Sequence, residues 1–320
     1  RPPRSTLSSS SAASDVYKRQ GLIRLGILYN RFDHEIIQDL KTTFFKSYKL
    51  TETSDFEKLN MSKISVDDLF VSEPDPSWFG NGPNEPDHPC WTNKNWLKSR
   101  FHFSFAEWHG GRNRFGCLRV VNDDLVQPSR GFGTHGHQDM EIITYILHGG
   151  LTHKDSMGSE ETLGRGSVQF MTAGTGVMHS EYNLDPEQDL RFIQSWILPR
   201  TQGLTPRYGS FSADSNTRHA RLNQWLHLVS DLEGTGKVQI HQDFNLSASE
   251  IEKGKSLKFE LKPFRQAFGL CLEGTLMVNQ MILEKHEAVE IPPTSEISSI
   301  TFSGQMGDEQ THLLLYEMSI

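Results

Sequence analysis

Two short segments of the sequence carry metal-ligand side chains at every second residue. His135 and His137 form one pair, and His179 and Glu181 form the other. Alternate side chains of a strand point to the same face, so each pair would share a face if its segment is extended. Two such strands facing each other would bring three imidazoles and one carboxylate to one point. This donor set predicts a site for a divalent transition metal.

The residues around these pairs have the pattern of short strands. Residues 142–147 are mostly apolar, a His-Gly-Gly turn follows, and residues 151–155 and 167–171 continue as further short strands. Turns separate them, and none shows a helical period over ten residues. The pattern predicts an antiparallel barrel or jelly roll. Polar side chains that point into such a barrel without partners would cost roughly 1–3 kcal/mol each, and a bound metal would remove that cost.

The HxHxxxE run that begins just after Gly131, Phe132 and Gly133, together with the glycine-rich segment that ends in HxE, resembles the two metal motifs of the cupins. Further segments narrow the resemblance to the pirin family, and within it to bacterial-type members that act as quercetin 2,3-dioxygenases. These segments are residues 101–106, 118–124, 155–158 and 170–176, continued by 196–199, 203–208 and 241–243. The resemblance covers roughly residues 91–320 and is strongest up to about residue 210.

The resemblance implies a set of metal ligands. In pirins the metal is held by the histidines of the HxH and by the histidine and glutamate of the HxE, which are here His135, His137, His179 and Glu181. Many other cupins instead use the glutamate that follows the HxH, which is Glu141 here. Glu141 has the same parity as the two histidines, so strand periodicity alone leaves both glutamates open. On the family pattern we expect Glu181 to be the fourth ligand and Glu141 to orient a ligand from outside the coordination sphere.

The implied cofactor is one divalent transition metal, with Fe(II) as the first expectation. Ligand type alone also admits nickel, copper, manganese and zinc. The implied partners are dioxygen and a small aromatic substrate of the flavonol type, such as quercetin. In that reaction the 3-hydroxyl of the flavonol loses its proton, dioxygen adds across the heterocyclic ring, carbon monoxide leaves and a depside remains. Glu181 is the expected catalytic base, although a nearby cation weakens a carboxylate as a base.

A binding module is the second interpretation. Some pirins are nuclear proteins that bind transcription factors, which implies a metal-dependent, redox-sensing module with a protein partner and no turnover. The nearby lysines are scattered and form no nuclear targeting run; they are Lys41, Lys46, Lys49 and Lys58.

A cupin isomerase for sugars is the third interpretation. Such an enzyme would need basic side chains near the site to hold a phosphate, because a phosphate carries negative charge. The candidates for that role are Arg112, Arg114, Arg119 and Arg130. We rank the dioxygenase first, the binding module second and the isomerase third. The ranking rests on the family resemblance, because cupins support many chemistries and the fold alone does not decide between them.

Other polar residues and glycines of the sequence are given structural interpretations. Asp123 and Asp124 are expected in a turn after a strand at 118–121. Gly174 and Gly176 are expected to be turn glycines at the entry to the HxE strand. Nine further histidines are not assigned to a ligand pair and are expected to be surface or packing residues: His102, His109, His148, His153, His219, His227, His241, His286 and His312.

The composition argues against some classes of function. The chain has 320 residues, a formal net charge of −8, and no basic block of the kind that binds nucleic acid. No stretch approaches the roughly 20 apolar residues that cross a bilayer. Cys90, Cys117 and Cys271 are far apart and lack CxxC spacing, which favours a reducing compartment. We expect a monomer in the cytoplasm. The nucleus is an alternative location, and the Ser- and Arg-rich N-terminus makes an organelle another.

The first part of the chain lies outside the resemblance. Residues 1–85 are expected to be an N-terminal extension, in part a leader or disordered. Residues 22–50 of this extension have apolar positions near a helical spacing, and residues 72–89, which run just past its end, are rich in Pro, Gly, Asn and Asp. We therefore expect a helix in the first of these stretches and a linker or extended arm in the second.

The rest of the chain divides into two halves. Residues 86–212 are expected to form the metal-binding cupin. Residues 213–320 have the pattern of a degenerate copy, because 268–278 repeats the strand-Gly-strand pattern of the first half while no HxH or HxE occurs. The expected fold is all-β, a bicupin of two antiparallel jelly-roll barrels with few short helices and an N-terminal extension. The C-terminal barrel is expected to lack a metal site.

Overall fold

Strands make up most of the described part of the chain. The computed structural model describes residues 59–83, 91, 92, 94–305 and 310–320, so the helix expected within residues 22–50 lies outside it. Residues 59–319 form one compact unit. Its helical elements are the α-helix α3 (Ser215–Arg221) and the short 3₁₀ turns η1 (Val66–Asp68) and η2 (Trp78–Gly80). The all-β double-barrel fold with few short helices, predicted from the sequence, is confirmed.

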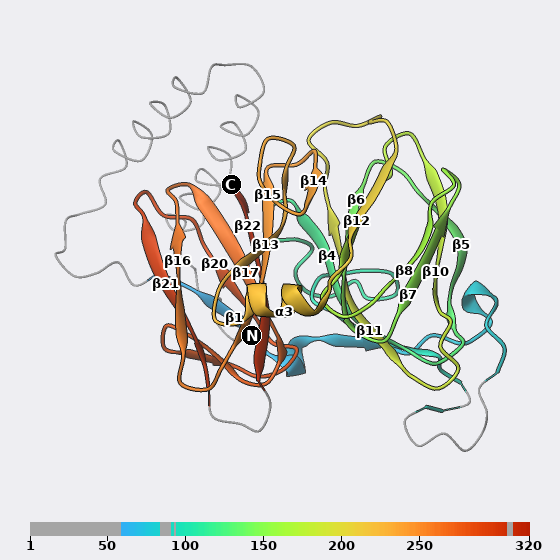
Figure 1. The fold of residues 1–320 in the computed structure, drawn as a ribbon, viewed down its shortest axis with the longest axis horizontal. Helices are drawn as coiled ribbons and strands as arrows, with labels where there is room; N and C mark the ends of the chain where they lie inside the picture. The colour runs from blue at the N-terminus through green and yellow to red at the C-terminus, as the bar shows by residue number, and fades with distance from the viewer. Residues whose placement is uncertain (1–58, 84–90, 93, 306–309) are drawn as a thin grey trace, which may run out of the picture. The chain divides into compact units, whose positions relative to one another are not determined.

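The N-terminal half consists of two facing sheets, drawn mostly in green to yellow in Figure 1. One has the strand order β12-β9-β6-β11-β4-β3-β2, and the other has the order β5-β10-β7-β8. The strands are β2 (Phe70–Ser72), β3 (Leu97–Phe101), β4 (Leu118–Val126), β5 (Gly131–His137), β6 (Glu141–His148), β7 (Leu151–Asp155), β8 (Glu160–Leu163), β9 (Val168–Thr172), β10 (Val177–Asn183), β11 (Leu190–Ile197) and β12 (Arg207–Phe211).

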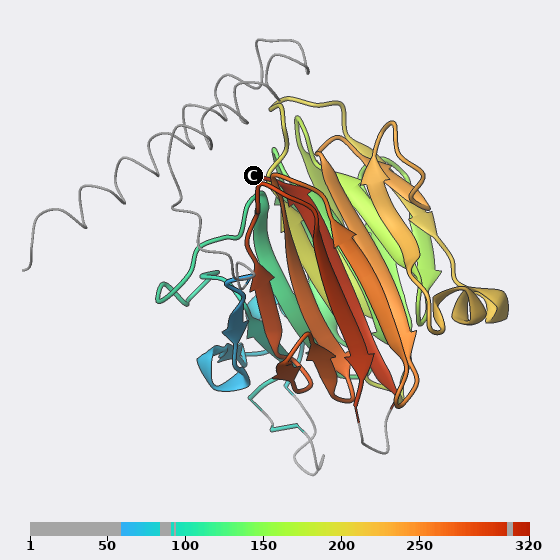
Figure 2. The ribbon, with the colours of Figure 1, turned by 90° about the vertical axis from the view of Figure 1, so that its left-hand side faces the viewer.

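The C-terminal half repeats this arrangement. Its larger sheet has the order β1-β20-β17-β22-β15-β13-β14, and its smaller sheet has the order β16-β21-β18-β19. Figure 2 shows the long strands of this half side by side, in orange and red. The strands are β1 (Ser62–Ile64), β13 (Leu226–Asp231), β14 (Val238–Ile240), β15 (Phe244–Ile251), β16 (Ser256–Leu261), β17 (Arg265–Glu273), β18 (Leu276–Val278), β19 (Met281–Leu283), β20 (Ala288–Ile291), β21 (Ser298–Gly304) and β22 (Thr311–Ser319). Among the strands of both halves, every pairing is antiparallel except that of β13 with β14.

The two large sheets share a hydrophobic core. Ile143 of β6 and Ile193 of β11 belong to the same buried cluster as Phe268 of β17 and Leu314 of β22. β6 is therefore buried on both faces, one toward its own barrel and one toward the other half. A strand in that position needs apolar side chains at nearly every residue, which explains why β6 shows no alternation of polar and apolar residues.

Asp123 and Asp124 lie inside β4, so their interpretation as a turn was wrong. Arg191 of the neighbouring strand β11 donates two hydrogen bonds of 2.9 and 2.7 Å to the Asp123 carboxylate, and His286 Nδ1 of the C-terminal half lies 2.5 Å from it. Burial opposes ionisation of Asp123, but the Arg191 guanidinium outweighs it and holds the pKa well below its usual value. No cation among the described residues pairs with Asp124, and burial raises its pKa to about 8. Because neighbouring strand residues face opposite ways, the two carboxyl groups have different environments.

An N-terminal arm, residues 59–83, precedes β3 and contains β1, η1, β2 and η2. Its strand β1 pairs with β20 of the C-terminal half, and β2 pairs with β3 of the N-terminal half. The Lys63 ammonium fixes β1 further by an ion pair of 2.5 Å with Glu287. Of the linker or extended arm expected over residues 72–89, the structure describes residues up to 83, and these include η2.

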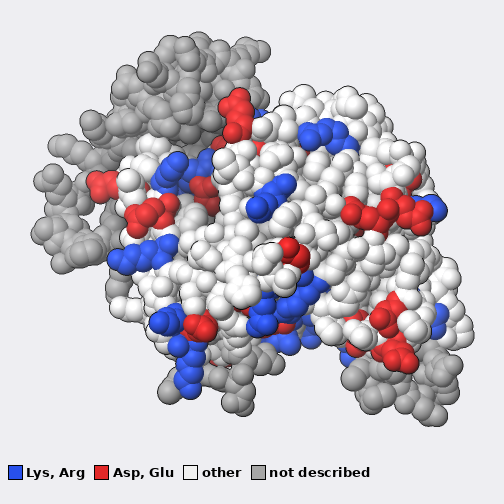
Figure 3. All heavy atoms as spheres, viewed as in Figure 1, with Lys and Arg blue, Asp and Glu red and all other residues white. Residues whose placement is uncertain are grey.

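The surface carries charges of both signs. On the face shown in Figure 3, basic and acidic side chains are interspersed. Among the described residues, no helix has the length and the apolar character needed to cross a bilayer.

Candidate metal centre

Two neighbouring strands of the small sheet carry the predicted ligand pairs. β5 pairs with β10, and in this register His135 lies directly opposite His179. Gly174 and Gly176 form the turn that leads into β10, as predicted. Gly174 has φ +45°, and a Cβ there would lie 1.9 Å from the carbonyl oxygen of Leu204. No other residue fits this turn, and the turn sets where β10 begins.

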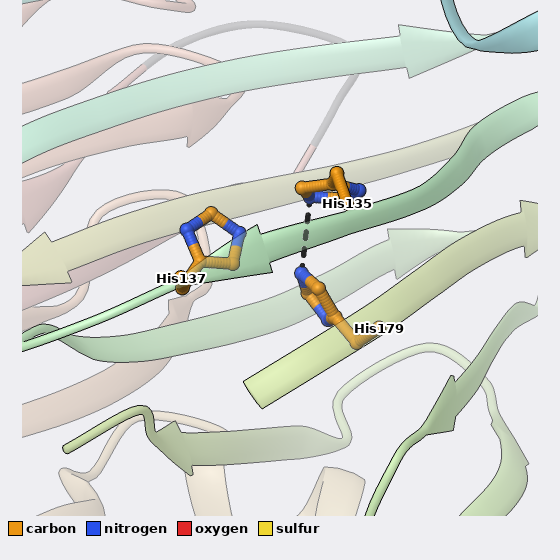
Figure 4. Close-up of side chains that lie close together, drawn as sticks. All are labelled: His135, His137 and His179. Atoms are coloured by element: carbon orange, nitrogen blue, oxygen red, sulfur yellow. Dashed lines mark hydrogen bonds between the residues drawn. The ribbon is translucent and has the colours of Figure 1, made fainter. Parts of the chain in front are cut away.

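Three imidazoles meet between these strands. Figure 4 shows His135 and His137 on one strand and His179 on the other, with their rings close together. The Nε2 atoms of His135 and His179 are 3.1 Å apart, and one ring nitrogen from each of the three histidines lies within 4.8 Å of the others. Two nitrogens at about 2.1 Å from one ion are roughly 3 Å apart when they occupy neighbouring coordination positions. The spacing of these rings therefore fits a shared metal ion.

The environment of the rings leaves them able to act as ligands. The ring of His135 donates from Nδ1 to the carbonyl oxygen of Gly133 at 2.8 Å, so its Nε2 carries the free lone pair. Burial, and then the neighbouring imidazoles, lower the pKa of both His137 and His179 to about 3. These two rings are thus neutral near pH 7, and only neutral imidazoles bind metals.

Glu181 lies close to His179 but does not belong to the group of His135, His137 and His179. A bulge between His179 and Glu181 shifts the register of β10 against β5. The Glu181 carboxylate is 2% exposed and accepts hydrogen bonds from Gln169 Nε2 at 3.0 Å and Gln194 Nε2 at 2.8 Å. It forms a second compact group with His179 and His153, so His179 belongs to both groups.

Glu141 belongs to neither group of potential ligands among the described residues, and its hydrogen bonds do not support the expectation that it orients a metal ligand. Its carboxylate accepts hydrogen bonds from the backbone N–H groups of His241 at 2.7 Å and Gln242 at 3.0 Å, and from the Thr172 hydroxyl at 3.3 Å. Glu141 begins β6 in the other sheet, and Asp139, with φ +49°, reverses the chain between the two strands. The parity argument fails at that turn because it holds only within one strand.

His153 and Asp155 are the site residues that the sequence interpretation missed. Both side chains are fully buried, and His153 Nε2 lies 2.9 Å from Asp155 Oδ2. His153 Nδ1 lies 3.5 Å from His179 Nδ1, and the Tyr208 ring stacks on His153 at 4.3 Å. His153 and Asp155 have the same spacing as the ligand pairs, and this signal could have found them. A carboxylate bonded to one ring nitrogen of a histidine fixes the tautomer that its other nitrogen presents.

A row of polar side chains crosses the large sheet opposite Glu181. Gln194 lies opposite Asn122 on β4 and Thr144 on β6, and Thr144 lies opposite Gln169 on β9. The two glutamines bind Glu181, while Asn122 Oδ1 and Thr144 Oγ1 are buried without a hydrogen-bond partner among the described residues. Buried polar atoms normally have partners, so this row suits a polar occupant of the barrel interior.

The comparisons with known proteins agree with this geometry. A family model named Pirin matches residues 85–197, and one named Quercetinase C-terminal cupin domain matches residues 227–318. A quercetin 2,3-dioxygenase of Escherichia coli (strain K12) is 34% identical over 236 residues, which cover 73% of this chain and 96% of that protein. The chain belongs to the pirin family.

Other relatives of this pirin include a pirin-like protein of Caulobacter vibrioides, 34% identical over 204 residues that cover 63% of this chain and 87% of that protein. The solved structure of YhhW from E. coli aligns with a TM-score of 0.66 and 28% identity, and covers 81% of this chain and 97% of that one. A structure of bacterial pirin YhhW in complex with nickel(II) aligns with a TM-score of 0.66 and 27% identity, and covers 81% of this chain and 99% of that one.

Three of the four arginines considered for a phosphate site in this pirin have other partners. Arg112 pairs with Glu290 at 3.5 Å. Arg119 donates to the carbonyl oxygens of Ser104 and Asn113. Arg130 donates to Gln127 and to the carbonyl oxygen of Pro83. These contacts do not favour the isomerase interpretation.

Replacing His153 by phenylalanine should weaken metal binding by about 10- to 100-fold, the usual effect of losing a partner that orients a ligand. The phenylalanine ring can keep the stacking with Tyr208, but it removes the bonds to Asp155 and His179. Competition with a chromophoric chelator measures the affinity. His148→Phe is the control, because His148 is exposed at the end of β6. Equal affinities in the two variants would assign His153 a packing role alone.

Proposed function

We propose that this pirin is a metal-dependent dioxygenase that opens the heterocyclic ring of a flavonol such as quercetin: dioxygen adds across the ring, both ring bonds of C3 break, C3 leaves as carbon monoxide, and a depside remains. The observation that carries the proposal is the group of three neighbouring imidazoles with a buried carboxylate beside them. The naming of the E. coli relative as a quercetin 2,3-dioxygenase supports it. The alternative is the binding module, in which the same site would hold a metal and catalyse no reaction.

His135, His137 and His179 would hold the metal, with Glu181 as the fourth ligand. The donor set fits such an ion: two of the rings have a pKa of about 3, and the Nε2 atoms of His135 and His179 face each other at 3.1 Å. A bound divalent transition ion, with Fe(II) as our first choice, would supply a Lewis acid for an ionised hydroxyl and a redox partner for dioxygen. The nickel(II) complex of bacterial pirin YhhW supports a metal site in this chain and keeps nickel among the candidate ions.

Glu181 is the proposed base for the 3-hydroxyl of the flavonol. Its carboxylate lies beside His179 and is held in place by amide groups on two different strands, Gln169 on β9 and Gln194 on β11. Such fixed orientation favours proton transfer, because a base acts only within hydrogen-bond reach of its proton. The unpartnered oxygens of Asn122 and Thr144 would be available for the polar groups of a substrate or for water.

Reconstitution of the metal-free protein tests this function. The protein is loaded without oxygen with Fe(II), Ni(II), Cu(II), Mn(II) or Zn(II), then given quercetin and air, and both bleaching and carbon monoxide are measured. We expect stoichiometric carbon monoxide with at least one metal, and none from the same metal without protein. One bound metal per chain with no turnover of any flavonol would exclude the dioxygenase and favour the binding module.

A further inference from the structure

The N-terminal arm lies against the edge strand of the metal-binding sheet. β5 is the outermost strand in the order β5-β10-β7-β8. The Asn81 side chain forms a double amide bond with Gly131 of this strand: it donates to the carbonyl oxygen at 2.8 Å and accepts from the N–H at 3.1 Å. At Gly133, a Cβ would lie 2.7 Å from the carbonyl oxygen of Phe79, so the arm approaches this closely only because residue 133 is glycine.

This docking brings an aromatic ring from the arm to the metal centre. The ring of Phe79 makes edge contacts with the imidazole of His135 at 5.4 Å and with the rings of Phe132 at 5.4 Å and Trp96 at 6.1 Å. Phe79 is nevertheless 39% exposed, and its φ of +60° is unusual for a residue other than glycine. The ring is thus held beside His135 while part of the residue stays exposed to solvent.

A second aromatic ring contacts the other histidine of the pair. The ring of Trp196 on β11 lies edge-on to His137 at 4.8 Å, and its Nε1 donates to Gln194 Oε1 at 3.0 Å. The partly exposed imidazoles of His135 and His137 therefore have Phe79 on one side and Trp196 on the other. Aromatic walls of this kind favour a flat aromatic ligand, because rings stack or pack edge to face.

One of these two aromatic residues lies inside the segment that matches the family model, and the other lies outside it. Trp196 lies within residues 85–197, which match the family model, whereas Phe79 precedes them. The ring on the His135 side thus comes from a segment outside the part of the chain that the family model describes.

We propose that Phe79 is a specificity-determining residue, with which the arm provides one aromatic wall for the substrate at the metal centre. The inference rests on the proposed function, because it assumes that a flat aromatic molecule binds at the metal. Phe79 transfers no proton and binds no metal. The ring selects for substrates with an extended aromatic surface and is indifferent to small ligands that reach only the metal.

Binding measurements without oxygen test this inference apart from turnover. The Ni(II)-loaded protein is titrated with quercetin, and separately with acetohydroxamate, which chelates metals but has no ring. Phe79→Leu keeps an apolar side chain and removes the ring. The matched control is Trp78→Leu, because Trp78 is the neighbouring exposed aromatic residue of the same segment.

For Phe79→Leu we expect quercetin to bind about tenfold more weakly, while the affinities for acetohydroxamate and for Ni(II) stay within twofold. Trp78→Leu should leave all three affinities within twofold. Unchanged quercetin binding in Phe79→Leu, an equal loss for acetohydroxamate, or no quercetin binding by the unaltered protein would each overturn the inference. A separate assay in air reads the proposed function: binding that depends on Phe79 without carbon monoxide release would reject the reaction and keep the aromatic wall.

Discussion

Replacing His135 and His137 together by alanine should abolish metal binding and all metal-dependent turnover. The double variant removes two of the three imidazoles that lie within 4.8 Å of one another and leaves His179 with the carboxylate of Glu181. Loss of a single partner outside the coordination sphere already weakens binding 10- to 100-fold, so the loss of two donors should exceed a hundredfold. Elemental analysis after reconstitution and dialysis gives the metal content, and carbon monoxide release gives the turnover.

The matched control is the double variant His109→Ala/His219→Ala. Both histidines are exposed, and neither belongs to the two groups of potential ligands among the described residues. It should keep one metal per chain and the turnover of the unaltered protein. Full metal content in His135→Ala/His137→Ala would show that the metal binds elsewhere, and the proposed centre would then be wrong.

Glu181→Gln should keep part of the metal and lose most of the turnover, by about a hundredfold or more if this carboxylate is the base. The three imidazoles remain, so metal can still bind. Both Glu181 oxygens accept an amide N–H in the structure, from Gln169 and Gln194. A glutamine offers one oxygen and one NH₂ group, so one of the two donors would face another donor and the side chain would shift. Single-turnover bleaching of quercetin at saturating metal separates slow chemistry from weak metal binding.

The control for this change is Glu160→Gln on β8. Glu160 is exposed and pairs only with Lys154 among the described residues, so the same chemical change there should leave metal content and turnover unaltered. If Glu181→Gln turns over at the rate of the unaltered protein, Glu181 has no part in the mechanism. A complete loss of metal in this variant would instead make Glu181 an indispensable ligand.

The strands and the group of three histidines could be predicted from the sequence, because both follow from the alternation of side chains within a single strand. Alternation within one strand aligned His135 with His137, and the turn at Gly174 and Gly176 could be recognised from its glycines. The same rule failed at Glu141, since a turn at Asp139 places it in the other sheet. Parity cannot be carried across a turn whose geometry is unknown.

Other features depended on contacts between distant parts of the chain. Asp123 was assigned to a turn because aspartate residues that follow an apolar strand are typical of turns. Its partners Arg191 and His286 lie 68 and 163 residues away along the chain. The position of Phe79 likewise depends on docking of the arm onto β5. Neither contact leaves a local pattern that the sequence could reveal.

The core shared by the two large sheets has a thermodynamic consequence for the C-terminal half, whose described residues include no group of potential metal ligands. Residues of β6 and β11 belong to one buried cluster with residues of β17 and β22, so neither half can unfold without exposing the apolar face of the other. A metal ion that binds only the folded N-terminal half thus raises the free energy of unfolding of both, by about 2.7 kcal/mol when free metal is a hundred times its dissociation constant. The melting of the C-terminal half, seen through Trp225 in its contact with Phe302, would then report the occupancy of a centre to which that half contributes no ligand.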